Sequence, residues 1–127
     1  MMILKHVGLA CSTEENADKF YRDLLGLNKS EPKILPLDLS RAIFDIEAEL
    51  KIINYIGKDL HFEVFISSRI NNKYRQIAHL CLEVDALSEF IQKCRGLGVE
   101  ISRIPKGDKF LTFVKDFDGN LFEIKGS

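Results

Sequence analysis

The sequence has no long hydrophobic run, no excess of either charge and no closely spaced cysteine pair, and each absence narrows the possible functions. No apolar stretch approaches the roughly 20 residues that a membrane-spanning helix needs, so we expect no membrane partner. The formal net charge is -1, and both signs are scattered along the chain, which leaves no basic stripe for a nucleic acid. A small molecule is therefore the expected partner.

The first residues also lack the features of an export signal. The segment "MMILKHVGLACSTEEN" has a short apolar patch and reaches acidic residues at once, unlike a signal peptide. The three cysteines have no CxxC spacing and lie in apolar segments, where a reduced thiol behaves as a small hydrophobic side chain: Cys11, Cys81 and Cys94. Cys81 is the one candidate nucleophile, with packing as its alternative role. We expect a cytoplasmic protein with reduced thiols.

What the chain does contain is enough apolar material for one folded domain. Its 127 residues are 46% hydrophobic and 29% charged, a globular composition. A chain of this length buries roughly two-thirds of its unfolded surface. We therefore expect a single domain, residues 1–127, with a substantial core.

Two segments with the same pattern open the two halves of the chain. In residues 3–11 and 77–85 apolar side chains alternate along the chain, which predicts two strands. His6 and His79 then project from the opposite face to the main apolar set. The repeated pattern predicts an internal duplication.

A helix is predicted after each of these strands. In the first half, Ser12 and Glu15 have the spacing of a capping box, and Gly26 is a natural stop. In the second half, Asp85 is the expected cap, and Gly96 or Gly98 ends an apolar stripe of helical spacing.

The two halves also end alike. "GKDLHFEVF" corresponds to "DGNLFEIKG", so Glu63 corresponds to Glu123. The separation from histidine to glutamate is 57 positions in the first half and 44 in the second, and a short extra helix at residues 38–46, capped by Asp38, accounts for the difference. We therefore predict two modules, 1–68 and 76–127, each running strand, helix and three strands, joined by a polar linker at 69–75.

Two histidines and two glutamates occur at corresponding positions of the two halves, and this repetition indicates one candidate metal site. Alone, each histidine reads as a hydrogen-bonded residue of a strand and each glutamate as part of a solvated strand face. Two imidazoles and two carboxylates at matching places suit a divalent metal: nickel or zinc first, and also cobalt, manganese or iron. The candidate ligands are His6, Glu63, His79 and Glu123. His61 shares the face of Glu63 and corresponds to Leu121, so it is either an additional ligand or a residue that lines the pocket.

These segments resemble the vicinal oxygen chelate superfamily, which includes glyoxalase I, methylmalonyl-CoA epimerase, fosfomycin-resistance thiol transferases, extradiol dioxygenases and bleomycin-binding proteins. The match lies in "HVGL…FYRDLLGL" and in "IAHLCLEV…GVE…FVKDFDGNLFEI", where Phe117 replaces the usual proline. The resemblance implies an α+β fold of two tandem βαβββ modules whose curled mixed sheets surround a metal. It places the ligands on His6, Glu63, His79 and Glu123, the set most similar to that of bacterial glyoxalase I. Epimerases usually have glutamine at the place of Glu63.

The resemblance also implies a chemistry. A divalent metal would polarise a carbonyl, and Glu63 or Glu123 would remove the neighbouring proton and return it through an enediolate, as in a lactoylglutathione lyase or an isomerase. Family members often pair, so a homodimer is expected, with each metal site formed within one chain or shared by two. Two alternatives stay open: thiol transfer or oxidative ring opening, and metal-free binding of a small drug.

Overall fold

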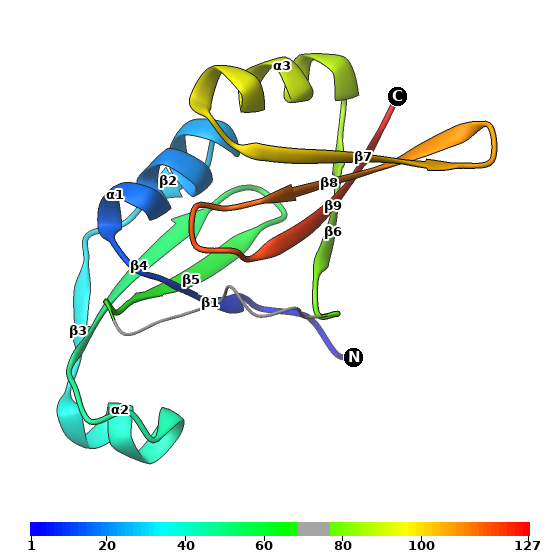
Figure 1. The fold of residues 1–127 in the computed structure, drawn as a ribbon. Coiled ribbons are helices and arrows are strands. Elements are labelled where there is room, and N and C mark those ends of the chain that lie inside the picture. Colours follow the sequence, from blue (N-terminus) through cyan, green and yellow to red (C-terminus); the bar gives the residue numbers. More distant parts are fainter. Residues whose placement is uncertain (69–76) are drawn as a thin grey trace. The chain divides into compact units, whose positions relative to one another are not determined.

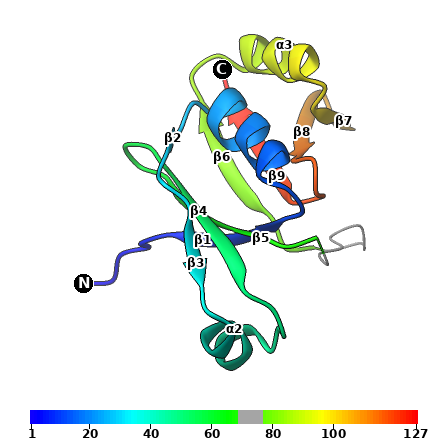
Figure 2. The ribbon, with the colours of Figure 1, turned by 90° about the vertical axis from the view of Figure 1, so that its left-hand side faces the viewer.

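The computed structural model describes residues 1–68 and 77–127 and divides the chain into two compact units, Met1–Ile70 and Asn71–Ser127. Figures 1 and 2 show the path of the chain through both units. The predicted linker, 69–75, lies outside the described residues. The division into modules 1–68 and 76–127 therefore stays a prediction.

Both units follow the predicted order, and unit 1 contains additional short elements. Unit 1 consists of β1 (Val7–Cys11), α1 (Glu14–Ala17), η1 (Asp18–Leu24), β2 (Asn28–Lys29), β3 (Lys33–Leu35), α2 (Leu37–Phe44), β4 (Leu50–Ile56) and β5 (His61–Ile66). Unit 2 consists of β6 (Leu80–Val84), α3 (Leu87–Leu97), β7 (Glu100–Lys106), β8 (Lys109–Lys115) and β9 (Leu121–Gly126). None of the helices in these described ranges is long and apolar enough to cross a membrane.

Each unit has one mixed sheet. The strand order is β1-β5-β4-β2 in unit 1, with β3 also paired to β4, and β6-β9-β8-β7 in unit 2. The first and last strands of each unit are parallel neighbours, β1 with β5 and β6 with β9, and the other pairs are antiparallel. The predicted α+β class with two βαβββ modules and mixed sheets is confirmed.

Aromatic side chains from the first helical segment fill the core of unit 1. Phe20 and Tyr21 are fully buried, and the ring of Tyr21 lies 5.6 Å from that of Tyr55 and 5.3 Å from that of Phe62. The predicted helix is present, and its second part, η1, is π-helical. The wider turn is evident where the Leu25 N–H bonds the carbonyl of Phe20, five residues earlier.

The predicted helix caps need correction. Thr13, not Ser12, caps α1, because its hydroxyl accepts a hydrogen bond from the Asn16 N–H at 3.1 Å. At α3 the cap residue is Ala86 without a side-chain bond, so the expected cap at Asp85 was also wrong.

The ends of the helices agree better with the sequence. Gly98 ends α3 with a φ of 75°, a left-handed conformation that glycine adopts without steric cost. The inserted helix α2 begins after Pro36 and ends at Asp45, which is left-handed at φ 58°. Asp38 lies in the first turn of α2 and does not cap it. In both views α2 lies at the opposite end of unit 1 from α1 (Figures 1 and 2).

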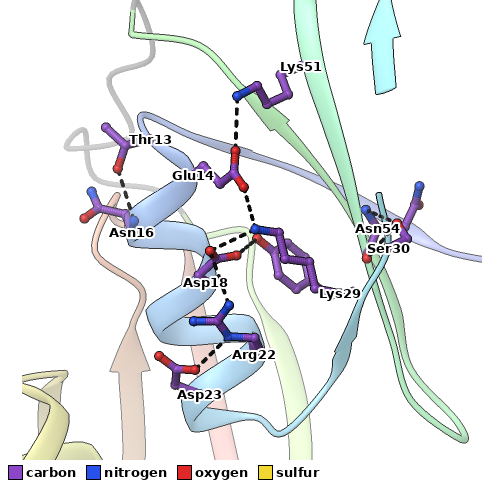
Figure 3. Close-up of polar contacts among 11 residues, drawn as sticks. Thr13, Glu14, Asn16, Asp18, Arg22, Asp23, Lys29, Ser30, Lys51 and Asn54 are labelled. Atoms are coloured by element: carbon purple, nitrogen blue, oxygen red, sulfur yellow. Dashed lines mark hydrogen bonds and ion pairs between the residues drawn. The ribbon is translucent and has the colours of Figure 1, made fainter. Parts of the chain in front are cut away.

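A cluster of ionic side chains ties the first helical segment to the sheet of unit 1 (Figure 3). The Lys29 ammonium bonds the carboxylates of Glu14 and Asp18, Lys51 bonds Glu14 at 3.1 Å, and the Tyr55 hydroxyl donates to Asp18 at 2.8 Å. Lys29 lowers the pKa of Glu14 by hydrogen bonding, with Lys51 adding to the effect, and Glu14 raises the pKa of Lys29. The cluster therefore stabilises the ionised forms of Glu14 and Lys29.

Replacing Lys29 by methionine should reduce the free energy of unfolding by about 1 to 2 kcal/mol at pH 7, because Glu14 and Asp18 lose a charged partner. The folded-state pKa of Glu14 lies below its ordinary value of 4.5, so this stabilisation is present above pH 4.5 and is lost as the pH falls through the lower, folded-state pKa. Urea unfolding of both proteins at pH 7 and pH 3 measures the difference.

A matched control is Lys115→Met, which removes an exposed pair with Glu100 at 3.6 Å and should change stability little. A Lys29→Met effect of equal size at pH 7 and pH 3 would show that lost packing, not lost charge, is responsible.

Candidate metal centre

The same strand register positions a histidine beside a glutamate in each unit. Gly8 pairs with Glu63 across β1 and β5, and Cys81 pairs with Glu123 across β6 and β9. His6 and His79 each lie two residues before the paired residue, and positions two apart share a face of a strand. Both histidines lie one residue before their strands begin, so the prediction that they belong to the strands was wrong by one position.

The two pairs have similar geometry. His6 Nε2 lies 3.5 Å from Glu63 Oε1, and His79 Nε2 lies 3.8 Å from Glu123 Oε1. Two ligand atoms that each lie about 2.1 Å from one tetrahedral ion are about 3.4 Å apart. Each pair is therefore spaced nearly as two ligands of a common ion would be.

The hydrogen bonding of His79 favours a cation between its ring and Glu123. His79 Nδ1 lies 2.7 Å from the carbonyl oxygen of Ile77, which can only accept, so Nδ1 carries a proton. In the neutral ring Nε2 then presents a lone pair toward the Glu123 carboxylate. An imidazole lone pair and a carboxylate oxygen at this spacing are both able to coordinate one metal cation. A backbone partner of this kind is also what orients histidine ligands in metal sites.

The chemistry of the donor set fits a divalent ion. Two imidazole nitrogens and two carboxylates suit zinc, nickel, cobalt, iron or manganese, and the carboxylates balance the charge of a divalent cation. Among residues 1–68 and 77–127, no group of three or more His, Cys, Asp or Glu side chains is gathered closely enough to hold a metal ion. What the structure brings together is one histidine–glutamate pair in each unit.

His61 interacts with an amide instead of joining the pair. Its Nε2 lies 2.7 Å from Asn54 Oδ1, and its ring centroid lies 5.6 Å from that of His6. Asn54 pairs with Glu63 across β4 and β5, so these polar side chains share one face of the sheet. The sequence analysis missed Asn54, although the alternation along residues 49–56 places it on the face opposite the buried Ile53.

A tight turn positions Glu123 in unit 2. The Asp116 carboxylate accepts bonds from the N–H groups of Asp118 and Asn120 and from the Asn120 side-chain amide, all at 2.8 to 2.9 Å. Gly119 has a φ of 93°, which glycine adopts readily. The turn that "FDGN" predicts is therefore held by Asp116, and β9 follows it directly.

Unit 1 has a cavity of about 320 Å³ beside the His6–Glu63 pair. We call it the α2 cavity, because Phe44 of α2 and Ile46 just after it form part of its wall. The cavity is lined by His6, Gly8, Leu9, Ala10, Phe44, Ile46, Leu50, Glu63 and Phe65. One side chain of the candidate pair, Glu63, thus faces a largely apolar space together with its histidine partner.

The surroundings of Glu123 differ from those of Glu63, and the sequence alone did not predict this difference. It lines a hollow of about 600 Å³ in unit 2 together with the lysines of the β7–β8 hairpin and of β9, namely Lys106, Lys109 and Lys125. Three lysines thus share the lining of this hollow with one glutamate. Lys106 pairs with Lys109 across the β7–β8 hairpin. A turn predicted between these two lysines would have indicated from the sequence that they lie side by side.

The cysteines differ in exposure. Cys11 and Cys94 are buried, and burial raises the pKa of the Cys94 thiol to about 11. Cys81 is exposed, unlike the other two cysteines, so it is not part of the core of unit 2. It lies beside Glu123 in the sheet.

The sequence matches a known protein family over nearly its whole length. Residues 3–124 match the family model of the Glyoxalase/Bleomycin resistance protein/Dioxygenase superfamily. Among curated proteins, the mitochondrial methylmalonyl-CoA epimerase of Mus musculus is 30% identical over 131 residues, which cover 96% of this chain and 71% of the epimerase.

Solved structures share the fold at low sequence identity. A glyoxalase family protein from Enterococcus faecalis superimposes with a TM-score of 0.74 at 20% identity, covering 96% of this chain and 95% of that one. A mutant of the fosfomycin resistance protein FosX from Listeria monocytogenes, complexed with Mn(II) and 1S,2S-dihydroxypropylphosphonic acid, also gives 0.74 at 16% identity, covering 100% of this chain and 92% of that one.

Proposed function

The chain belongs to the Glyoxalase/Bleomycin resistance protein/Dioxygenase superfamily, and on this premise we propose that it is a metal-dependent isomerase or lyase that transfers a proton at the carbon beside a carbonyl. The observation that carries the proposal is the repeated His–Glu geometry, with nitrogen-to-oxygen distances of 3.5 Å and 3.8 Å. His6, Glu63, His79 and Glu123 together form the ligand set for one divalent ion, nickel or zinc first.

The proposed roles follow from the positions of these side chains. A bound divalent ion would polarise the substrate carbonyl and so acidify the neighbouring C–H group. Glu123 and Glu63, whose side chains are 18% and 26% exposed, are accessible enough to take and return a proton. The hydrogen bond of His79 to Ile77 keeps its ring in one orientation. With such an ion bound, Glu123 or Glu63 would take the proton from this carbon and return it.

The relatives favour an epimerase over a glyoxalase I as the specific form of this activity. The curated protein at 30% identity is a methylmalonyl-CoA epimerase, not a lactoylglutathione lyase. Lysines beside Glu123 support a substrate with an anionic part, such as an acyl-CoA thioester. The glutamate at position 63 supports the glyoxalase I-like form, so the assay includes both substrates.

We further propose that the working form is a cytoplasmic homodimer. The four-ligand set is completed either by the two units of one chain or by units of two chains. Mixing variants that lack different histidines distinguishes these arrangements, as described in the Discussion.

Proton exchange tests the function directly. Protein loaded separately with nickel, zinc, cobalt and manganese is incubated in D2O with methylmalonyl-CoA or with the hemithioacetal of methylglyoxal and glutathione, and proton NMR follows the C–H signal beside the carbonyl. We expect metal-dependent deuterium incorporation with one of the two substrates, abolished by a chelator. Absence of exchange above the buffer rate with both substrates and all four metals would overturn the proposal.

A further inference from the structure

The α2 cavity differs in polarity from the pair beside it. Of its nine lining residues, His6 and Glu63 alone are ionisable, and the other seven are glycine, alanine, leucine, isoleucine or phenylalanine. Its volume, about 320 Å³, is within the range of sites for small ligands. A ligand that reaches the pair from this cavity must therefore leave an apolar part in contact with these walls.

The wall on the α2 side comes from the segment that only the first half of the chain contains. Phe44 packs edge-on against Phe65, with ring centroids 5.0 Å apart. Asp45 ends the helix in a left-handed conformation, and Ile46, directly after it, also lines the cavity. The hollow beside Glu123 in unit 2 has three lysines in its lining instead.

Glycine at position 8 leaves room in this cavity. A Cβ built on Gly8 would lie 3.5 Å from Phe65 Cε2, an ordinary contact, and Gly8 has no positive φ. A larger side chain is therefore compatible with the backbone here and would project into the cavity. Gly8 lies directly beside Glu63 in the sheet, so the open space adjoins the candidate pair.

We propose that the α2 cavity binds a nonpolar substituent on the substrate carbonyl, a branched aliphatic or aromatic group, and that α2 limits its size. The inference rests on the proposed function, because the cavity selects a substrate only if the His6–Glu63 pair holds the reacting end. It adds the substrate class: carbonyl compounds with a compact apolar group at one end.

Hydroxamic acids test the cavity separately from catalysis, because they present two neighbouring oxygens to a metal and differ only in their substituent. Isothermal titration calorimetry of the nickel-loaded protein compares acetohydroxamic acid with benzohydroxamic acid. We expect benzohydroxamic acid to bind about tenfold more tightly, as partial burial of the ring predicts. Equal affinities would overturn the cavity assignment while leaving the proposed function intact.

Two variants locate the effect. Gly8→Leu should fill the cavity and weaken the binding of benzohydroxamic acid more than that of acetohydroxamic acid, so that the preference for benzohydroxamic acid is lost. Ile104→Ala is the matched control: Ile104 is 46% exposed in unit 2 and lines neither the α2 cavity nor the hollow beside Glu123, so the preference should persist. A preference that survives Gly8→Leu would place the apolar site elsewhere.

Measurements on metal-free protein distinguish failure of the proposed metal site from failure of the proposed cavity. If neither hydroxamic acid binds, the proposed metal site fails, and the cavity is then tested with benzyl alcohol by following the methyl NMR signals of Ile46 and Leu50. Perturbation of both signals, absent in Gly8→Leu, supports the cavity without the metal site. Signals that do not move in the metal-free protein would overturn the cavity as well.

Discussion

Replacing Glu123 by glutamine is expected to lower the rate of proton exchange by about a hundred- to ten-thousand-fold while leaving the fold intact. Glutamine keeps the size and shape of the side chain but cannot take up a proton. The β9 backbone pairs with both β6 and β8, and the Glu123 carboxylate is not needed for that pairing. Deuterium incorporation by NMR gives the rate, and circular dichroism and thermal unfolding report on the fold.

Two further glutamate variants are needed to interpret this result, one as a control and one as a test of the second candidate base. Glu100→Gln makes the same chemical change on β7, at a side chain that is 66% exposed and pairs only weakly with Lys115, and it should not affect exchange. Glu63→Gln makes the change in the other pair. If Glu63 and Glu123 are both bases, Glu63→Gln should still exchange the proton of one stereoisomer but should no longer epimerise the substrate. If Glu123 is the single base, Glu63→Gln should retain both exchange and epimerisation. Wild-type exchange in Glu123→Gln would rule out its role as a base.

Replacing His79 by alanine should remove the bound metal. Native protein is expected to contain about one divalent ion per chain, and loss of one of four ligands weakens binding enough for the ion to be lost during purification. Inductively coupled plasma mass spectrometry measures nickel, zinc, cobalt, iron and manganese in both proteins. Thermal unfolding of the variant, compared with chelator-treated wild type, distinguishes metal loss from misfolding.

The outcome of the metal analysis separates three hypotheses. His61→Ala is the control, because His61 interacts with Asn54 and should not be required for the metal. Metal in wild type and in His61→Ala, but not in His79→Ala, supports the four-residue site. Metal that persists in His79→Ala would overturn it, and wild type that takes up no metal even after reconstitution would favour a drug-binding protein.

Mixing the His6→Ala and His79→Ala proteins after partial unfolding tests how the ligand set is completed. If units of two chains complete each site, a mixed dimer has one intact ligand set and regains about half of the metal. If the two units of a single chain complete it, mixing restores none. Size-exclusion chromatography with light scattering determines the oligomeric state at the same time.

Strand predictions succeeded because the pattern along the chain depends on burial. In β5 and β8, residues with buried side chains alternate with residues that are less buried, and alternation of this kind can be read without a structure. The caps were less predictable, since Ser12 and Thr13 are both good cap residues and the backbone conformation at Thr13 decides between them. Phe20, Tyr21 and Leu24 are buried in the π-helical segment η1, and their spacing, which also fits an α-helix, does not reveal the helix type.

The sequence by itself determined the α+β class, the duplicated module and the identity of the four candidate ligands, because each depends on residue type and on periodicity. The spacing of each histidine and glutamate depended on tertiary structure, since the register of parallel strands brings together residues 57 and 44 positions apart. Tertiary structure also decided the surroundings of the two glutamates, which are apolar beside Glu63 and rich in lysine beside Glu123. Side chains that are distant in the chain form each lining.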